Sequence, residues 1–481
     1  MADRPDSKPQ KSTPPPKSGA SKDGPAKRRW WHDRRKLAAA IAGSVLVLGA
    51  GAAIAYNHFK RPGDVSNPDV PFKTEKPSKP VVKTTNWPMY GYNRRHTRYL
   101  PATKVKPPFK RLWKYGDRPL IEFPPIFVRA PGLCERRTKM GCQGRLYFVD
   151  NNGNAYSLDA NTGKILWHRQ ISGKNGNASS PTYARGRLYL VTLSPGQVMS
   201  LDAKTGKTIW RRSLPGRSES SPIVVGHKVI FGCENGQLFA VSDRNGKTKW
   251  TAQLAGPVKG SPAYDKGVVF VGDYGGEMSA VRARNGHIVW QASSQGLSFS
   301  RQGEFYSTPA VAFGRVYSGN NDARIYSFDE KTGALAWSYS TGSYAYGSTS
   351  VANTKATGPT VYVGSYDGNL YALNAKTGQP RWTQSVGGPV IGSTSVIGNI
   401  VYVATFQGTT TNGYKLSNGK KVVSFHTGAY HPVISDGRRI YLTGYSSVQA
   451  MQPYEPKPKN AGGKSGKSGK GGGAKKKSAK G

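Results

Sequence analysis

The middle of the chain alternates short runs of β-branched and aromatic residues with polar turns, and one such unit occupies residues 361–382, VYVGSYDGNLYALNAKTGQPRW. VYVGS and NLYALNA suit half-buried strands. Asp367-Gly368 between them supplies the positive φ angles of a tight hairpin. Gly378 in the second turn can enter the left-handed region, and Trp382 follows in a third strand. The unit therefore predicts three antiparallel strands joined by two turns.

The same unit recurs along the chain as YSLDANTGKILW, MSLDAKTGKTIW, FAVSDRNGKTKW, MSAVRARNGHIVW and YSFDEKTGALAW. One aromatic residue closes each copy, and successive copies place it 40 to 54 residues apart. These blade-packing positions are Trp113, Trp167, Trp210, Trp250, Trp290, Trp337, Trp382 and Phe425. The period is typical of four-stranded propeller blades.

A fourth strand precedes the other three in each unit and starts with a Ser/Thr-Pro or similar step, as in SSPTY, SSPIVV, GSPAY and STPAVAF. The C-terminal part supplies HPVIS, RRIYLTGY and SSVQAM, which make three strands of one more blade. The isolated strand around Trp113 is the missing fourth. We therefore predict an all-β, eight-bladed β-propeller of four-stranded antiparallel blades, closed by pairing of N- and C-terminal strands, which removes open sheet edges.

The recurring A-x-D-x-x-T-G-x-x-x-W pattern and the opening WPMYGYNRRHTRY resemble the pyrroloquinoline-quinone-type (PQQ-like) β-propeller repeat family over residues 87–451. That family includes quinoprotein alcohol and glucose dehydrogenases and the propeller lipoprotein of the outer-membrane β-barrel assembly machine. The resemblance therefore implies either quinone-dependent oxidation or a scaffolding role in the envelope.

The region before the repeats is predicted to contain a membrane anchor. Residues 1–36 are rich in Pro, Ser and Lys and predict a disordered basic cytoplasmic tail, whereas residues 37–56 carry no charge. Twenty helical residues span roughly the ~30 Å core of a bilayer. Lys and Arg are more frequent before this segment than after it, which predicts a single-pass signal anchor in the cytoplasmic membrane with an extracytoplasmic propeller. The alternative is secretion after cleavage near Ala55.

The remaining boundaries follow from composition. Residues 57–86 predict a Pro-rich stalk, residues 87–452 the propeller, and residues 453–481 a disordered Gly/Lys-rich basic tail. The net charge is +44; residues 1–83 carry +10 and residues 457–481 carry +9, which leaves +25 between them. Such a surface favours an anionic wall polymer or lipid surface as partner, and export argues against nucleic acid. The candidate anion-binding residues are Arg94, Arg95, Arg136, Arg137, Lys139, Arg211, Arg212, Arg438 and Arg439.

The three cysteines divide into a pair and a single residue. Cys134 and Cys142 flank ERRTKMG in the long connection between the first two strands of blade 1. We predict a disulfide between them, which suits an oxidising compartment, with free thiols or half of a metal site as the alternative. Cys233 is expected to be a buried strand residue.

The sequence offers little for catalysis. No H-x-H or H-E-x-x-H pattern occurs, and residues 150–154 resemble a calcium loop but stand where other blades have a hairpin turn. Quinoprotein dehydrogenases typically use adjacent cysteines, a calcium ion and a catalytic aspartate, and this chain has no Cys-Cys pair. We therefore expect no catalytic, cofactor-binding or metal-binding residues, and a non-catalytic binding or scaffold module. A PQQ-dependent oxidoreductase and an envelope assembly factor with a protein partner are the alternatives.

Overall fold

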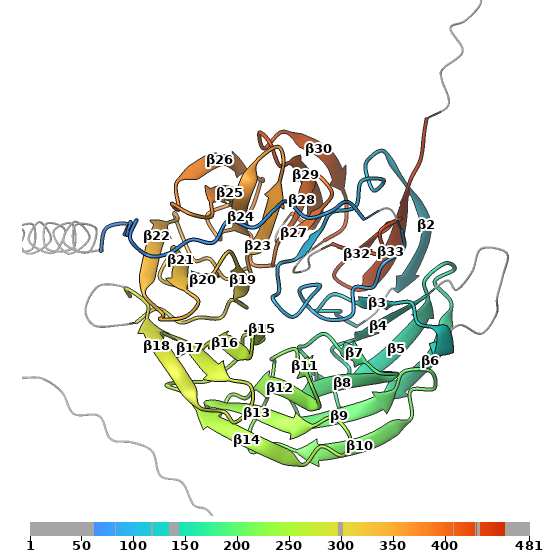
Figure 1. Cartoon of the computed structure of the whole chain (residues 1–481). Coiled ribbons are helices and arrows are strands. Elements are labelled where there is room, and N and C mark those ends of the chain that lie inside the picture. Colours follow the sequence, from blue (N-terminus) through green and yellow to red (C-terminus); the bar gives the residue numbers. More distant parts are fainter. Residues whose placement is uncertain are drawn as a thin grey trace, which may run out of the picture. The chain divides into compact units, whose positions relative to one another are not determined.

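The computed structural model describes residues 62–456, except 82, 117–118, 134–143, 297–301, 407, 429 and 431–432. These residues form eight antiparallel sheets arranged around one axis as the blades of a propeller, which confirms the predicted fold class (Figure 1). The expected transmembrane segment 37–56, the tail 1–36 and most of the tail 453–481 lie outside the described residues. Within them, no helix is long and apolar enough to cross a membrane.

Each blade is a meander whose first strand lies nearest the axis. Blades 1 to 4 contain β3 (Ile126–Val128), β4 (Arg145–Val149), β5 (Asn154–Asp159) and β6 (Ile165–Gln170); β7 (Thr182–Ala184), β8 (Arg187–Thr192), β9 (Gln197–Asp202) and β10 (Thr208–Ser213); β11 (Ile223–Val225), β12 (Lys228–Gly232), β13 (Gln237–Ser242) and β14 (Thr248–Gln253); and β15 (Ala263–Asp265), β16 (Val268–Gly272), β17 (Glu277–Arg282) and β18 (Ile288–Ser293).

Blades 5 to 7 repeat this order. They contain β19 (Ala310–Ala312), β20 (Arg315–Asn320), β21 (Arg324–Asp329) and β22 (Leu335–Ser340); β23 (Ser350–Thr354), β24 (Gly358–Gly364), β25 (Asn369–Asn374) and β26 (Pro380–Ser385); and β27 (Ser395–Ile397), β28 (Ile400–Thr405), β29 (Thr410–Lys415) and β30 (Lys421–Phe425). A short strand, β1 (Tyr99–Leu100), adds to blade 7 in parallel with β27, and one 3-10 turn, η1 (Pro131–Leu133), follows β3.

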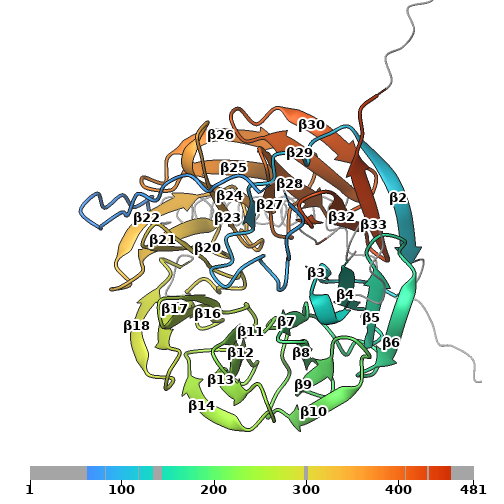
Figure 2. The same ribbon diagram turned by 45° about the vertical axis from the view of Figure 1, so that its right-hand side comes forward.

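Blade 8 joins the two ends of the propeller. It contains β31 (Ile434–Ser435), β32 (Ile440–Thr443), β33 (Ser447–Pro453) and β2 (Phe109–Gly116). β2 pairs antiparallel with β33, with Phe109 opposite Pro453 and Gly116 opposite Ser447 (Figure 2). The prediction that the strand around Trp113 completes the last blade is confirmed.

The repeated tryptophans link neighbouring blades. Each of the seven indole N–H groups donates to a backbone carbonyl at the start of a turn in the next blade, at distances from 2.8 Å (Trp382 to Leu416) to 3.2 Å (Trp113 to Ala160). Blade 8 lacks that turn, because its third and fourth strands come from opposite ends of the chain. Phe425, which has no N–H group to donate, packs there on Phe109 with ring centroids 5.9 Å apart.

The segment predicted to be a Pro-rich stalk, residues 57–86, makes contacts with the propeller that the sequence interpretation did not include. From residue 62 onward it packs on the propeller: Ser66 pairs with Trp337 at the free edge of β22, and the Lys73 N–H donates to the Phe313 carbonyl at 2.9 Å. Val70 is buried in the core beside Phe313, and Phe72 packs against the same ring. These two apolar residues give a Pro-rich stretch enough buried surface to hold it in place.

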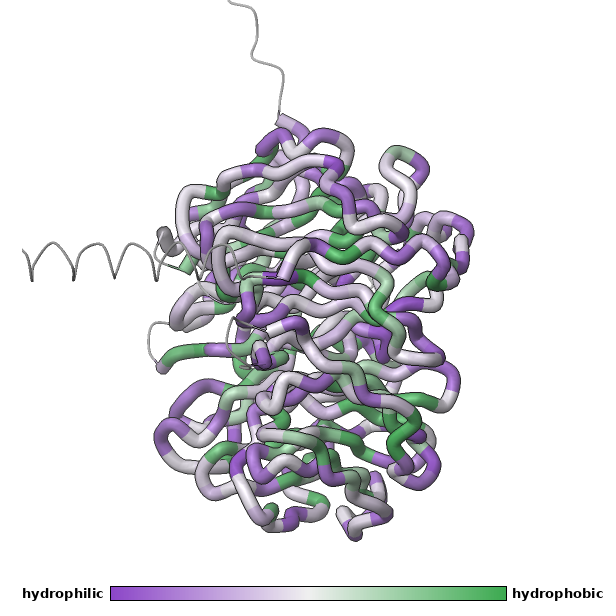
Figure 3. Tube along the Cα trace, turned by 90° about the vertical axis from the view of Figure 1, so that its left-hand side faces the viewer, coloured by the Kyte–Doolittle hydropathy of each residue, from purple (hydrophilic) through white to green (hydrophobic). Residues whose placement is uncertain are grey.

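Hydrophobic residues follow the strands, and hydrophilic ones gather in the turns (Figure 3). The core consists of clusters that join facing sheets, such as Leu188, Met199 and Leu201 of blade 2 with Tyr147 and Trp167 of blade 1. Packing between successive blades therefore holds the ring together and positions the turns and connections at its two ends.

Candidate functional site at the propeller axis

The ring has two chemically different ends. Because strands within a blade are antiparallel, the turns between third and fourth strands share one end, which we call the turn face. It comprises residues 160–164, 203–207, 243–247, 283–287, 330–334, 375–379 and 416–420. The segments that lead into each new blade lie at the other end, which we call the connection face. It comprises residues 120–125, 171–181, 214–222, 254–262, 302–309, 341–349 and 386–394.

A chain of hydrogen bonds joins the blades near the axis. At the Ser/Thr step of one blade, the backbone N–H donates a hydrogen bond. The acceptor is the hydroxyl oxygen of the corresponding residue in the next blade. The bonds run from Ser180 to Ser221, Ser221 to Ser261, Ser261 to Thr308, Thr308 to Ser348 and Ser348 to Ser393, with lengths of 2.9 to 3.2 Å. The short hydroxyl side chains of the repeat thus hold the inner ends of six blades in register.

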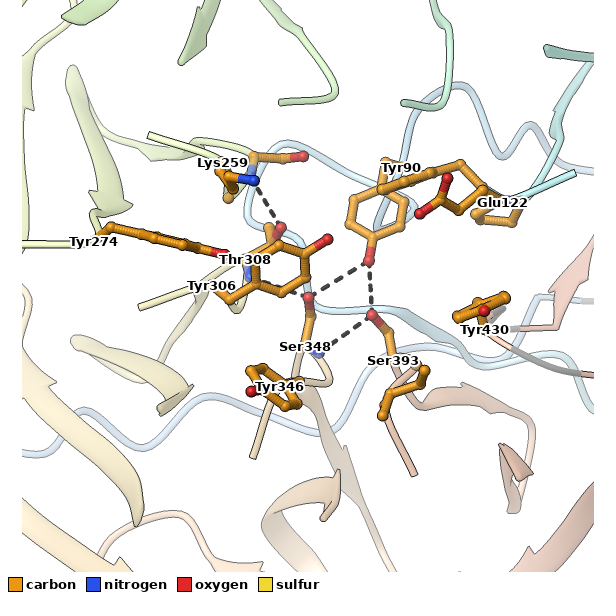
Figure 4. Close-up of a pocket in the computed structure, with 16 residues that line it drawn as sticks. Tyr90, Glu122, Lys259, Tyr274, Tyr306, Thr308, Tyr346, Ser348, Ser393 and Tyr430 are labelled. Carbon is orange, nitrogen blue, oxygen red and sulfur yellow. Dashed lines mark hydrogen bonds between the residues drawn. The ribbon is translucent and has the colours of Figure 1, made fainter. Parts of the chain in front are cut away.

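The residues two positions before the six linking residues face the axis: Ala178, Glu219, Lys259, Tyr306, Tyr346 and Ile391. Glu122 and Tyr430 hold the equivalent positions ahead of blades 1 and 8, which makes eight axial residues, one from each blade. Six of them, all but Ala178 and Glu219, line a cavity of about 280 Å³ together with Tyr90, Phe123 and Tyr274 (Figure 4). The cavity is thus surrounded by side chains from different blades.

Tyr90 forms one wall of this cavity and comes from the segment that precedes the first blade. Its hydroxyl lies 2.7 Å from Ser393 Oγ and 3.5 Å from Ser348 Oγ. Residues 87–100 follow the first strands around the axis, and the Thr97 and Arg98 carbonyls accept backbone N–H groups of β23 and β27 at 2.9 and 2.8 Å. The Arg98 guanidinium is buried and lies 4.8 Å from the Tyr90 ring centroid, which fixes that ring.

Charged groups at the cavity are mainly acidic. The Lys259 ammonium lies 3.0 Å from Glu219 Oε1, 3.6 Å from Glu234 Oε1 and 5.4 Å from the centroid of the Tyr274 ring. The Tyr306 hydroxyl donates to Glu219 Oε2 at 3.4 Å. One lysine is therefore held by two carboxylates and the face of a tyrosine.

Burial changes the acidity of these groups. It raises the pKa of the Glu122 carboxyl, the neighbouring Glu219 carboxylate raises it further, and Lys259 opposes both. Burial, followed by the charge of Glu219, raises the pKa of the Tyr306 hydroxyl well above its usual range. Tyr306 therefore remains a hydrogen-bond donor at neutral pH.

The lining does not suit the tricarboxylic quinone that the resemblance implies. Such an anion needs cationic partners, and the cation in this lining, Lys259, is already paired with Glu219. Glu122 adds a second carboxylate that would repel it. Among the described residues, no group of three or more His, Cys, Asp or Glu side chains is placed to hold a metal ion. We derive no chemistry through a quinone at this site.

The predicted anion-binding residues do not form one cluster. Arg211 and Arg212 are exposed on β10, and Arg94 and Arg438 are exposed beside blades 4 and 8. Arg95 instead pairs with Asp265 and Glu75 at 3.1 and 3.2 Å, and Arg439 pairs with Asp436 at 3.2 Å and donates to the Ala160 carbonyl at 3.0 Å. Arg136, Arg137, Lys139, Cys134 and Cys142 lie outside the described residues.

Two other sequence interpretations fall within the described residues. Residues 150–154 form a hairpin turn in which Asp150 accepts the Asn154 N–H at 2.9 Å and the Tyr156 hydroxyl at 2.8 Å. Cys233 is buried and unpaired, and it lies directly after β12 rather than within it. The sequence reasoning missed the axial residues, although their constant offset from the Ser/Thr step could have located them.

Comparison with known proteins points to one family. The sequence matches the family model described as outer membrane protein assembly factor BamB over residues 130–262 and 249–455. No curated protein matches the chain.

Solved structures support the fold alone. BamB from Moraxella catarrhalis is 19% identical, with 72% of this chain and 100% of that chain covered and a TM-score of 0.57. The quinohemoprotein alcohol dehydrogenase ADHIIG from Pseudomonas putida HK5 is 15% identical, with 78% and 82% covered and a TM-score of 0.62. The computationally designed Ika8 protein is 14% identical, with 74% and 99% covered and a TM-score of 0.55. A likeness shared by an enzyme, an assembly factor and a designed protein assigns no activity.

Proposed function

Because the chain belongs to the PQQ-like β-propeller family of the outer membrane protein assembly factor BamB, we propose that it is a non-catalytic binding module of the cell envelope. In this proposal the propeller stands outside the cytoplasmic membrane and docks through its turn face on an anionic polymer or anionic lipid. One observation carries it: all seven segments of the turn face present exposed basic side chains. They are Lys164, Lys204, Lys207, Arg244, Lys247, Arg284, Lys331, Lys376 and Lys420.

The local structure of these turns explains why their basic groups dominate. In blade 2 the Asp202 carboxylate accepts the Thr205 N–H at 2.8 Å and the Thr205 hydroxyl at 2.7 Å, so it is used within the turn. Lys204 and Lys207 of the same turn remain exposed. A ring of such turns sets up a positive potential over one end of the propeller, where a polyanion is attracted by many weak contacts at once.

A second candidate function is protein assembly through the connection face. Tyr344 of this face is 42% exposed, and Tyr366 and Tyr445, in turns between second and third strands at the same end of the ring, are 39% and 57% exposed. Tyrosine is enriched in protein interfaces because its ring is large and its hydroxyl tolerates water. A protein that co-purifies in stoichiometric amount and is lost on Tyr344→Ala and Tyr366→Ala substitution supports this alternative.

The turn-face proposal is tested with soluble poly(glycerol phosphate) and the full chain in neutral detergent. The double variant Lys204→Gln, Arg244→Gln removes two charges from the turn face. The matched double variant Lys174→Gln, Arg217→Gln removes two exposed charges from the connection face of the same blades. At about 1 kcal/mol for each lost contact, the first variant should bind roughly 30-fold more weakly at low salt, and the second should resemble the parent protein.

Salt provides the independent readout. Affinity of the parent should fall linearly on a log-log plot against salt, and the turn-face variant should show a smaller slope. Equal losses in the two variants, or binding that ignores salt, would contradict docking through the turn face. Nanodiscs of anionic lipid in a second arm distinguish a lipid from a polymer as the preferred surface.

A further inference from the structure

We propose that the axial cavity of the connection face binds a ligand through an ammonium or guanidinium group. The group can belong to a free amine or to a lysine or arginine side chain of a peptide. This site lies at the opposite end of the ring from the turn face, so it is independent of the polyanion binding proposed above.

The chain itself already shows how the cavity holds a cation. The Lys259 ammonium lies 3.0 Å from one Glu219 oxygen and 5.4 Å from the Tyr274 ring centroid, so it is bound by a carboxylate and a tyrosine face together. The second Glu219 oxygen is fixed by the Tyr306 hydroxyl at 3.4 Å. Carboxylates and aromatic faces are the partners that cations prefer in partly dehydrated sites.

Glu122 offers a second carboxylate, which no cation of the described residues contacts directly. Its side chain lines the cavity, and in the described part of the chain it makes neither a hydrogen bond nor an ion pair. Tyr90 and Phe123 lie beside it, with their ring centroids 5.8 Å apart. In the view of Figure 4, Glu122 and Lys259 stand on different sides of the Tyr90 ring. A ligand cation placed at Glu122 would therefore meet a carboxylate with aromatic rings nearby, the same pair of groups that surrounds Lys259 at Glu219.

The remaining lining favours a cation of modest size. Tyr306 makes T-shaped contacts with Tyr274 and Tyr346, at centroid distances of 6.2 and 6.1 Å, so three tyrosine rings line the cavity together. The cavity of about 280 Å³ is near the lower end of ligand pockets, which begin at ~300 Å³. It suits the end of one side chain or a short amine. An anion is disfavoured because Glu122 and Glu219 would repel it.

The positive net charge of the chain means that a bound cation must be held by local contacts in the cavity. The whole chain carries +44, so a cationic ligand is repelled at long range and must be held by local contacts. Binding of a cation to this protein therefore cannot be ascribed to general electrostatic attraction.

The experiment uses the full chain in neutral detergent, with titration calorimetry of two probes, 1,5-diaminopentane and the peptide acetyl-Lys-Lys-Lys-amide. The same peptide with acetylated side chains is the uncharged control. Glu122→Gln should weaken binding about tenfold, because a hydrogen bond to a charged group is lost. Glu455→Gln removes the same charge from an exposed position away from the cavity and should leave the affinity unchanged.

Substitution of Lys259 should change the affinity for the probes in the opposite direction to Glu122→Gln. Lys259→Met keeps most of the length of the side chain and removes its charge, so Glu219 loses its cation and Glu234 keeps only Arg217, 3.8 Å away. Both probes should then bind more tightly, by roughly tenfold, because the added ammonium neutralises Glu219. Glu219→Gln on that background should reverse the gain.

Each outcome has a defined meaning. Binding of the diamine, the peptide or both, with the expected variant effects, supports the site and identifies the source of its cation. Absence of binding by both probes, equal affinity for the acetylated peptide, or weaker binding by Lys259→Met overturns the proposal. Polyanion binding by the turn face is measured separately and does not depend on these results.

Discussion

The contact between each tryptophan and a glycine of the next blade can be measured with one matched pair of substitutions. Gly206 and Gly186 both lie in blade 2, and both have positive φ angles, 72° and 77°. A Cβ atom on Gly206 would lie 2.7 Å from the Trp167 ring, whereas one on Gly186 would meet nothing within 4 Å. The two positions therefore share the backbone cost of alanine and differ in the contact with the ring.

The magnitudes follow from these geometries. Alanine in the left-handed region costs about 1 kcal/mol relative to glycine, so Gly186→Ala should lower the free energy of unfolding by about that amount. Gly206→Ala must also displace the indole, which adds about 1 to 3 kcal/mol for overpacking. Loss of the 3.2 Å hydrogen bond from Trp167 to the Ala203 carbonyl would add about 1 kcal/mol more.

Guanidinium unfolding of the full chain in neutral detergent, followed by tryptophan fluorescence, measures both variants under the same conditions. Gly206→Ala should unfold at clearly lower denaturant than Gly186→Ala. In a Trp167→Leu background the difference between the two glycine substitutions should shrink, since the ring that causes it is gone. Equal destabilisation in the parent background, or a difference that survives removal of Trp167, would refute the packing argument.

Three further predictions concern other parts of the molecule. Burial raises the pKa of Asp273 to about 6, so between about pH 4 and pH 6 the folded protein binds a proton that the unfolded chain has released; stability should fall as pH rises through this window, and Asp273→Asn should flatten the slope seen in denaturation at a series of pH values. Peptide mapping without reductant should recover Cys134 joined to Cys142, whereas alkylation of both in the unreduced native protein would contradict the disulfide. Protease added to intact, wall-stripped cells should digest the propeller, and its survival until lysis would contradict an extracytoplasmic position.

The fold was predictable because its determinants recur. In six units the tryptophan follows the turn glycine by four residues, and a Ser/Thr step opens most blades. Each of these features makes a recurring contact with the adjacent blade. The stalk prediction did not anticipate the contacts of residues 66–73 with blade 5, because composition averages over a segment. Proline and lysine dominate residues 57–86, but Val70 and Phe72 supply the buried contacts that decide the position of the chain there.

The axial site was harder to recognise from the sequence because no single residue type recurs in every blade. Its eight positions hold Glu, Ala, Lys, Tyr and Ile, so no repeated residue type marks them. Adjacent basic residues also differ in exposure, because neighbours in an extended or turning chain point in different directions. Arg438 is exposed while Arg439 turns toward Ala160, and Arg94 is exposed while Arg95 pairs with Asp265.

Closure of blade 8 sets an order of events during synthesis. β2 leaves the ribosome early, and its partner β33 is made more than three hundred residues later. Until then the nascent chain carries a strand with an unpaired edge, and the hydrogen-bonding groups of that edge are open to any other extended chain nearby. Translation that stops before Ser447 leaves β2 without the partner that joins it to the eighth blade, so the propeller can close only after β33 (Ser447–Pro453) has been made.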